Sequence, residues 1–348
     1  MGRQIVFTAP KQVGFLEYED PPLAPDQVRI ATLYSGLSSG TELTAYRGTN
    51  VYLAKRWDPG ARLFLPIQDE TASQSFPLSF GYEDVGRVIE VGGGVEGVAE
   101  GDTIYGAWGH RTTHVLSADN AREHKFPAEL DPILGIFMGI APTALNAILD
   151  ADIHVGETVV VFGEGTVGQI ITQLARLNGG KVIAVDLMDN RLELAKALGA
   201  HRVMNPNQGS VAEEVRRITN GRGADVVLEV TGVPAALHEA IRTCAYSAKV
   251  IAVGFHQGGS GDLRLGDEFH HNRINIVSSQ IHGVNPSLTY RWNSARLQEA
   301  VIELLLRDDL HLRELVTHIV PFDDAARGVD VADRQLDGVV QVVFDTGA

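Results

Sequence analysis

Hydrophobic and polar residues follow two different patterns along the chain, and the change falls near residue 150. Before about residue 125, short apolar runs with partial alternation are bounded by turns rich in glycine and proline. Such runs predict strands, here at 5–7, 13–16, 28–31 and 86–91. Because short strands with frequent turns are typical of a small barrel, we expect a barrel-like fold for this part of the chain.

From residue 150 onward, predicted strands and helices alternate. The apolar run 158–162 is typical of a strand buried on both faces, and residues 165–178 show the spacing of an amphipathic helix. A second strand at 181–186 and a second helix at 190–198 continue the series. Further strands are expected at 203–204, 225–230, 249–253 and 275–278, with helices at 211–219 and 234–245. This βαβ series predicts a doubly wound parallel sheet, and so an α/β fold class.

Two other regions have patterns of their own. The C-terminal part predicts an amphipathic helix at 294–307, a short helix at 321–331 and a final strand at 339–344. Residues 49–79 show little periodicity, and we interpret them as a candidate substrate lid because long loops inside compact domains are often functional. A loop that contacts a second subunit is the alternative. This excursion carries the aromatic residues Tyr52, Trp57, Phe64 and Phe76.

Composition narrows the class of protein. A length of 348 residues corresponds to roughly two domains. The single cysteine, Cys244, excludes an internal disulfide and any four-thiolate metal site within one chain. The formal net charge of -15 disfavours a nucleic-acid partner, because phosphate backbones need basic surface. The most apolar segment, 132–148, is short and interrupted by polar residues, so we expect no membrane partner and a cytoplasmic location.

A glycine-rich sequence, G-E-G-T-V-G, joins the strand predicted at 158–162 to its helix. Gly163 permits the tight turn, Gly165 lets a pyrophosphate approach the backbone, and Gly168 lets helix and strand pack closely. Thr166 and Val167 stand at the helix start, whose free N–H groups attract the anionic pyrophosphate. In this βαβ setting the sequence predicts a dinucleotide site.

An acidic residue, Asp186, ends the next predicted strand, 18 residues after Gly168. A carboxylate there accepts hydrogen bonds from the adenosine ribose and repels a 2′-phosphate, so we predict NAD rather than NADP. Arg191 follows, and a guanidinium at that place is able to hold a 2′-phosphate, which leaves NADP as the less favoured alternative. A plain glycine turn with a solvated aspartate is the other interpretation.

The order of a β-rich part, a nucleotide fold and a return to the first part resembles the medium-chain dehydrogenase/reductase superfamily, which includes the zinc alcohol dehydrogenases. Residues 81–86 (G-Y-E-D-V-G) resemble the family's G-H-E-x-x-G, and matching segments lie at 101–104, 143–147, 156–161, 229–232 and 253–255. The resemblance implies a GroES-like catalytic domain (1–140 and 289–348) around a Rossmann domain (141–288). It also implies cofactor contacts for Thr143, Thr231, Gly254 and Ser279, and a homodimer formed through an edge strand near Asn275 to Ile281.

Several positions depart from the zinc enzymes of that superfamily. Ser38 or Ser39 stands where those enzymes place a cysteine ligand, and Tyr82 replaces the histidine of G-H-E. The next ligand position falls near Gly139. Hydroxyls and a glycine do not bind zinc as thiolate and imidazole do, and Cys244 lies away from these positions. The resemblance therefore implies a member of the family that needs no zinc.

One further stretch narrows the resemblance. The sequence S-x-G-T-E at 38–42, followed by Y-R-G at 46–48, resembles a branch that includes bacteriochlorophyllide hydroxyethyl dehydrogenase, as does W-G-H-R at 108–111. We do not carry the chlorin substrate over to this chain. The aromatic residues of the excursion favour a small-molecule substrate that is bulky or ring-shaped.

Without zinc, a side chain must take the hydroxyl proton when an alcohol loses its hydride. Tyr82 beside Glu83 is the first candidate, Ser38 extends a relay, and His110 has a suitable intrinsic pKa. Each side chain also has a structural interpretation, as a packing aromatic, a turn cap or a satisfied buried group. His110 is expected on a strand, sharing its face with His114. A metal held by one of these histidines with Glu83 is a further alternative.

We therefore predict a zinc-independent oxidoreductase that transfers a hydride between NAD(H) and an alcohol or carbonyl substrate. An NADPH-dependent quinone or enone reductase is one alternative, and it predicts a neutral or basic residue where Asp186 stands. A catalytically silent nucleotide-binding relative is the other.

Overall fold

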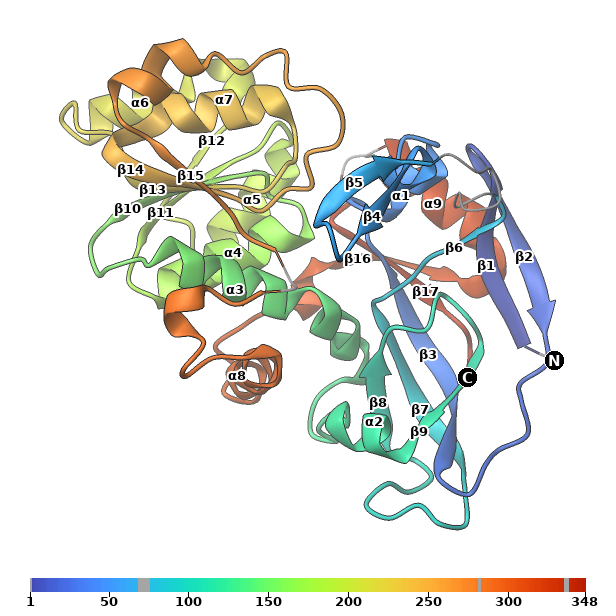
Figure 1. Ribbon diagram of the computed structural model, residues 1–348. Helices are drawn as coiled ribbons and strands as arrows, with labels where there is room; N and C mark the ends of the chain where they lie inside the picture. The colour runs from blue at the N-terminus through green and yellow to red at the C-terminus, as the bar shows by residue number, and fades with distance from the viewer. Residues whose placement is uncertain (1, 68–75, 281–282, 335–337) are drawn as a thin grey trace. The chain divides into compact units, whose positions relative to one another are not determined.

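The computed structural model describes residues 2–67, 76–280, 283–334 and 338–348, and the chain forms two compact units (Figure 1). Unit 1 contains Met1–Gly139 and Val316–Ala348, and unit 2 contains Ile140–Leu315. The sequence predicts that the chain returns to the first domain at residue 289, whereas the structure places the return at 316. The reason is helix α8 (Ser294–Leu306), which contacts α3 (Ala141–Ala151) and so belongs to unit 2.

Unit 2 alternates strands with helices. Its strands are β10 (Thr158–Phe162), β11 (Lys181–Val185), β12 (Arg202–Met204), β13 (Ala224–Glu229), β14 (Cys244–Ala252) and β15 (Asn275–Ser278). Its other α-helices are α4 (Thr166–Leu177), α5 (Asp189–Ala197), α6 (Val211–Ile218) and α7 (Pro234–Thr243). Short turns of helix lie at η4 (Pro206–Gln208), η5 (Leu265–Phe269), η6 (Pro286–Leu288) and η7 (Arg313–Leu315).

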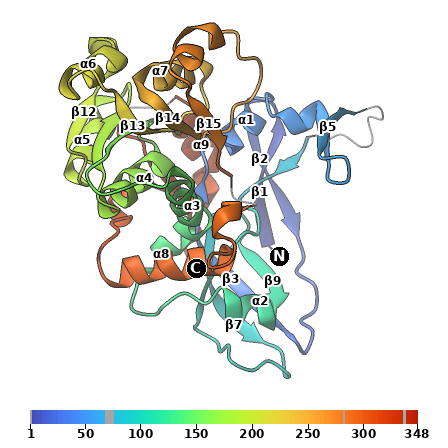
Figure 2. The same ribbon diagram turned by 60° about the vertical axis from the view of Figure 1, so that its left-hand side comes forward.

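The six strands form one sheet in the order β12-β11-β10-β13-β14-β15, and every neighbouring pair is parallel. Figure 1 and Figure 2 both show α6 and α7 on one face of this sheet and α3 and α4 on the other. All five residues of β10 are buried, and Val160 and Phe162 share a core with Val215 and Ile241 from the covering helices. The continuous apolar run therefore has the position that a strand covered on both faces requires.

Unit 1 is rich in strands, as the short apolar runs predict. They are β1 (Gly2–Ala9), β2 (Gln12–Tyr18), β3 (Gln27–Leu37), β4 (Lys55–Asp58), β5 (Leu63–Pro66), β6 (Leu78–Ser79), β7 (Asp84–Val91), β8 (Thr103–Gly106), β9 (Thr113–Ser117), β16 (Val316–Pro321) and β17 (Gln341–Asp345). The helices are α1 (Glu42–Tyr46), α2 (Ala118–Glu123) and α9 (Ala325–Arg334), with η1 (Val51–Leu53), η3 (Pro132–Gly139) and η8 (Phe322–Asp324).

The strands of unit 1 form a sheet in the order β16-β17-β3-β7-β8, to which β9 adds by pairing with β3, and a smaller sheet in the order β2-β1-β6. Strand β17 runs antiparallel to β3, with Val343 opposite Gly36. The C-terminal strand thus lies beside a strand from the first forty residues. This pairing places the end of the chain within the unit that holds the candidate catalytic residues.

Three local expectations from the sequence are wrong. His110 lies in a turn before β9, with a left-handed φ of +45° after Gly109 at +86°, so it shares no strand face with His114. Within the excursion, residues 55–66 form the hairpin β4–β5, because Asp58 Oδ1 accepts the N–H groups of Gly60 (3.0 Å) and Ala61 (2.9 Å) and so makes a tight turn. The residue after α7 begins β14 instead of extending the helix. Residues 68–75 of the excursion lie outside the described residues.

The apolar segment near residue 140 is divided by a bend. Among the described residues, no single helix is long and apolar enough to cross a membrane. The helices Pro132–Gly139 and Ala141–Ala151, bent by 48°, meet the criteria of length and composition only when they are counted together.

Candidate active site

The glycine loop between β10 and α4 has the close contacts that its spacing predicts. Gly163 has a φ of +95°, and its N–H donates to the carbonyl of Val185 at 2.8 Å. A Cβ on Gly165 would meet open space, so a ligand is able to approach the backbone there. A Cβ on Gly168 would lie 1.7 Å from the carbonyl oxygen of Gly163, which no side chain tolerates. The loop therefore fits a dinucleotide pyrophosphate at the start of α4, where Thr166 and Val167 stand.

Asp186, at the end of β11, is held against this loop. Its Oδ2 accepts the N–H of Glu164 at 2.7 Å, and its Oδ1 accepts the N–H of Met188 at 2.9 Å. Arg191 lies 3.9 Å from Oδ2. Each carboxylate oxygen still has capacity for a further hydrogen bond. The geometry suits a ribose diol, with the guanidinium nearby.

The other predicted cofactor contacts lie along one edge of the sheet in unit 2. Ligands of open α/β sheets bind at the carboxyl ends of the strands. Gly163, Asp186, Thr231, Gly254 and Ser279 each follow the carboxyl end of a different strand, namely β10, β11, β13, β14 and β15. Neighbouring loops touch: a Cβ on Gly254 would lie 2.1 Å from the backbone nitrogen of Gly232. Thr143 stands in α3, the helix that precedes β10.

Glu229, which sequence reasoning missed, ties two of these loops together. This buried carboxylate ends β13 and accepts the N–H groups of Thr231 (2.8 Å) and Gly232 (3.2 Å) as well as the Thr231 hydroxyl. From the loop after β14, His256 Nε2 lies 2.9 Å from its Oε2. The sequence did carry a signal, an acidic residue two positions before Thr-Gly at the end of an apolar strand.

Glu164, the second residue of the glycine loop, carries a fully buried carboxyl group that the sequence did not single out. Its Oε1 accepts the Thr172 hydroxyl at 2.8 Å, whereas Oε2 has no hydrogen-bond partner among the described residues. Burial raises the pKa of Glu164 well above its usual range, and the nearby carboxylate of Asp186 acts in the same direction. The neutral form is favoured, which keeps negative charge out of a loop suited to a pyrophosphate.

Replacing Glu164 by Gln should stabilise the protein increasingly as the pH rises. The folded-state pKa of this group lies above its unfolded value, so its contribution to stability is complete below about pH 4.5 and is lost as the pH rises toward the folded pKa. We expect E164Q to raise the unfolding temperature by roughly 2 °C or more at pH 8 and by less at pH 5. Thermal denaturation at both pH values, with the exposed Glu193→Gln as control, tests this; an equal change at the two pH values would contradict it.

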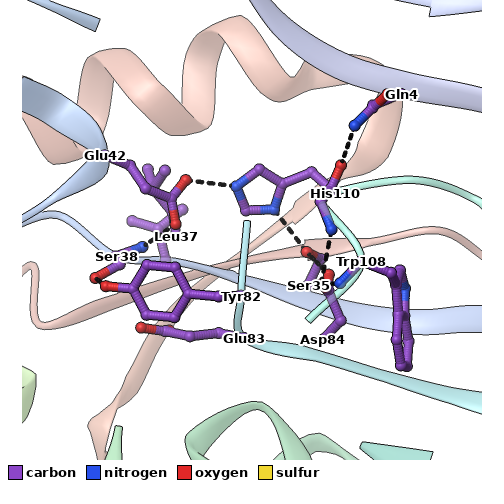
Figure 3. Close-up of polar contacts among 12 residues, drawn as sticks. Gln4, Ser35, Leu37, Ser38, Glu42, Tyr82, Glu83, Asp84, Trp108 and His110 are labelled. Atoms are coloured by element: carbon purple, nitrogen blue, oxygen red, sulfur yellow. Dashed lines mark hydrogen bonds and ion pairs between the residues drawn. The ribbon is translucent and has the colours of Figure 1, made fainter. Parts of the chain in front are cut away.

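In unit 1, the three positions that stand in for zinc ligands come together, and Figure 3 shows Ser38 and Tyr82 side by side. The hydroxyls of Ser38 and Tyr82 share a short hydrogen bond, while Ser39 is exposed, so Ser38 is the relevant serine. A Cβ on Gly139 would lie 3.5 Å from Cδ2 of the Tyr82 ring and 2.6 Å from the Tyr82 carbonyl oxygen. Burial raises the pKa of Tyr82, and the carboxylates of Glu83 and Glu42 raise it further, so the phenol keeps its proton.

Glu83 is fully buried beside this hydroxyl pair. Its Oε2 accepts Nε2 of Gln341 from β17 at 3.0 Å, and a Cβ on Gly36 would lie 2.6 Å from the same oxygen. Its Oε1 has no hydrogen-bond partner among the described residues. Burial, aided by the carboxylate of Glu42, raises the pKa of Glu83 to about 8, against the lowering effects of the charged His110 ring and of its hydrogen bonds. A carboxyl group with such a pKa is able to exchange a proton near neutral pH.

His110 stands at the centre of a buried chain of hydrogen bonds (Figure 3). Its Nε2 lies 2.6 Å from Oε2 of Glu42, and its Nδ1 lies 2.6 Å from the Ser35 hydroxyl. Ser35 donates its own proton to Asp84, so Nδ1 must donate to Ser35 and both ring nitrogens carry protons. Burial lowers the pKa of His110, but the carboxylates of Glu42 and Asp84 outweigh it, and the net pKa lies above its usual value. Glu42, Ser35 and Asp84 were missed at the sequence level, although two of them lie within the motifs noted above.

The groups around the hydroxyl pair do not fit a zinc ion. Zinc sites in proteins use thiolate, imidazole and carboxylate ligands, and the corresponding positions here present two hydroxyls and a glycine. Both ring nitrogens of His110 are engaged, and the ring of His114 stacks on Trp108 with centroids 5.8 Å apart. Within the part of the chain that the structure describes, no three His, Cys, Asp or Glu side chains are grouped to hold a metal.

Comparison with known proteins agrees with this fold. The family of zinc-binding dehydrogenases matches residues 166–299. D-guloside 3-dehydrogenase from Escherichia coli (strain K12) is 31% identical over 325 residues, which cover 92% of this chain and 93% of the relative. The chain therefore belongs to the medium-chain dehydrogenase/reductase superfamily, and it is an alcohol dehydrogenase-like oxidoreductase.

Two further matches extend over almost the whole chain. (R,R)-butanediol dehydrogenase from Bacillus subtilis (strain 168) is 27% identical, with 90% of this chain and 91% of the relative covered. The crystal structure of 2R,3R-butanediol dehydrogenase from Bacillus subtilis superposes with a TM-score of 0.78 at 22% identity and covers 99% of both chains. The predicted α/β fold class and family are thus confirmed.

Proposed function

We propose that the protein interconverts an alcohol and a carbonyl compound with NAD(H), and that its Ser38–Tyr82 hydroxyl pair takes the role that zinc has in related enzymes. The observation that carries the proposal is the pair itself, which lies beside Gly139 and next to a buried carboxyl group with a pKa of about 8. Two hydroxyls are able to hold a substrate oxygen by hydrogen bonds and to pass a proton onward.

In the oxidation direction, the proton of the substrate hydroxyl passes to Oη of Tyr82. Tyr82 gives its own proton to Oγ of Ser38, its hydrogen-bond partner, and Ser38 gives its proton to the carboxylate of Glu83, with which it also interacts. Each hydroxyl gains one proton and loses one, and Glu83 ends protonated. In the reduction direction, the protons move back along the same path.

A bound dinucleotide supplies the hydride acceptor for oxidation. The glycine loop at 163–168 would hold its pyrophosphate, and Asp186 would hold the adenosine ribose. The carboxylate of Asp186 favours NAD over NADP, because a 2′-phosphate there meets like charge. Thr143, Thr231, Gly254 and Ser279 are the candidates for the nicotinamide end.

We propose a secondary alcohol of a sugar derivative or polyol as the substrate class. The named relatives act on D-guloside and on butanediol, and both compounds carry such hydroxyl groups. We further propose a homodimer formed through β15, which lies at the edge of its sheet with Ile276 exposed. Ile281, at the end of the segment predicted for this contact, lies outside the described residues.

Metal analysis with a turnover assay tests the proposal. After growth with added zinc and dialysis against dipicolinate, we expect less than a tenth of an equivalent of zinc and undiminished NAD-dependent oxidation of a panel of secondary polyols and glycosides. One equivalent of zinc whose removal abolishes turnover would overturn the zinc-independent mechanism. Tight binding of NADH with no turnover on any substrate would favour a catalytically silent protein.

A further inference from the structure

We infer that Glu42 and His110 are positioning residues for the Ser38–Tyr82 hydroxyl pair. The inference rests on the proposed function and deepens it, because it assigns a task to a buried charged cluster that the proton path does not use. All four side chains of this cluster, which are those of Ser35, Glu42, Asp84 and His110, are 2% exposed or less.

Glu42 is the link between the cluster and the hydroxyl pair. Its Oε1 accepts the backbone N–H of Ser38 at 3.1 Å, and its Oε2 lies 2.6 Å from His110 Nε2. One oxygen of the Glu42 carboxylate thus holds the backbone of Ser38, and His110 holds the other carboxylate oxygen in place. The hydroxyl of Ser38 is carried on a short side chain and therefore moves with the Ser38 backbone. A shift of Glu42 therefore changes the distance between the Ser38 hydroxyl and the Tyr82 hydroxyl.

The far end of the cluster is anchored to the backbone. Oδ2 of Asp84 accepts the N–H groups of Trp108 (2.8 Å) and Gly109 (3.1 Å), and its Oδ1 accepts the Ser35 hydroxyl. The chain of contacts therefore runs from the turn at 108–110, through the His110 ring, to Ser38. Every charged member has a partner of opposite charge or a hydrogen-bond donor, as buried charges require.

The backbone around His110 is arranged for this ring. His110 has a φ of +45°, which is uncommon for a residue with a side chain, and Gly109 precedes it at +86°. A Cβ on Gly81 would lie 2.6 Å from the His110 nitrogen and 2.9 Å from its Cγ. Sparsely populated backbone conformations persist where the surroundings hold them in place, and they cluster at functional sites. Here the strained residue carries the imidazole that orients Glu42.

The charges facing His110 come from two elements. Glu42 belongs to α1, Asp84 begins β7 and Glu83 directly precedes that strand; from β17, the neutral ring of Phe344 packs edge-on at 5.4 Å. The Glu42 carboxylate also acts on Glu83, whose pKa it raises. Neutralising Glu42 should therefore make Glu83 lose its proton more readily, in addition to loosening Ser38.

Two substitutions at Glu42 separate the effect of its negative charge from the effect of its side-chain length. In the wild-type holoenzyme, alcohol oxidation should rise with pH as Glu83 loses its proton, with a midpoint near pH 8. Glu42→Gln keeps the length of the side chain, and we expect it to move this midpoint down by roughly half a unit or more. Glu42→Asp keeps the charge but shortens the side chain, and we expect it to lower kcat roughly tenfold with little change in the midpoint. The matched control, the exposed Glu90→Gln on β7, should behave as wild type.

The outcomes distinguish the two proposals. Wild-type kcat and midpoint in both Glu42 variants would overturn the positioning role, and so would a lower unfolding temperature with an unchanged kcat and pH profile. If Glu42→Gln does not fold, Glu42→Asp alone tests the positioning role. A lower kcat with an unchanged KM for NAD would then support that role, and a wild-type kcat would overturn it. Wild-type turnover that shows no rise with pH, or that needs zinc, refutes the proposed function instead.

Discussion

Tyr82→Phe should lower kcat for alcohol oxidation by roughly 10²- to 10⁴-fold, because positioned proton transfer contributes about that much to enzymatic rates. The substitution removes one oxygen and leaves the ring that packs beside Gly139, so the fold should persist. Binding of NADH should be unchanged, since the glycine loop and Asp186 belong to the other unit. Steady-state kinetics and fluorescence titration with NADH measure the two properties separately.

The matched control is Tyr46→Phe, a buried tyrosine of the same unit whose ring lies 5.4 Å from that of Phe7. It should keep wild-type turnover. Full activity of Tyr82→Phe would remove the phenol from the proton path and leave it as a packing aromatic. Loss of NADH binding in that variant would show that its effect is structural.

Asp186→Asn should weaken the preference for NAD over NADP. The change removes the negative charge that repels a 2′-phosphate and weakens the hydrogen bonds to a ribose diol. A hydrogen bond to a charged group contributes about 1.5–3 kcal/mol, so the ratio of kcat/KM for NAD to that for NADP should fall by roughly 10- to 100-fold. Arg191, 3.9 Å from the carboxylate, lies near the position of that phosphate and favours its negative charge.

Kinetics with both cofactors checks this prediction, with Asp189→Asn as the control. Asp189 stands in the first turn of α5, and its Oδ1 accepts a hydrogen bond from Nδ2 of Asn205 at 2.7 Å. The control should keep the wild-type ratio. A wild-type enzyme that is stabilised by NADP alone would contradict the cofactor proposal before any variant is made.

The fold was largely predictable because its signals are local. The apolar strand at 158–162, the glycine spacing and Asp186 lie within thirty residues, and their roles follow from one βαβ unit. The hydroxyl pair was reached only through the family resemblance, since Ser38 and Tyr82 are far apart in sequence and no periodicity joins them. The structure then decided between Ser38 and Ser39, because only Ser38 is buried.

The buried cluster around His110 shows what sequence patterns miss. A strand was expected there, and neither the left-handed turn at His110 nor its ion pair with Glu42 follows from local spacing. Glu42 and His110 are 68 residues apart, and Gln341 reaches Glu83 across 258 residues. Contacts of this kind depend on which strands pair and in which register. The sequence pattern indicates where the strands lie along the chain, but it does not indicate their register. Glu164 was not singled out for another reason: the spacing of the glycines does not indicate which side chains of the loop are buried.

The contact between Gln341 and Glu83 also bears on how the protein is made. Unit 2 is continuous in sequence, so it is able to fold on the ribosome once residue 315 has emerged, as domains generally do during synthesis. Unit 1 must wait for β17, which completes its sheet beside β3 and brings the amide that holds Glu83. Unit 2 is therefore able to form before unit 1, and Glu83 meets the amide of Gln341 only after β17 has been synthesised.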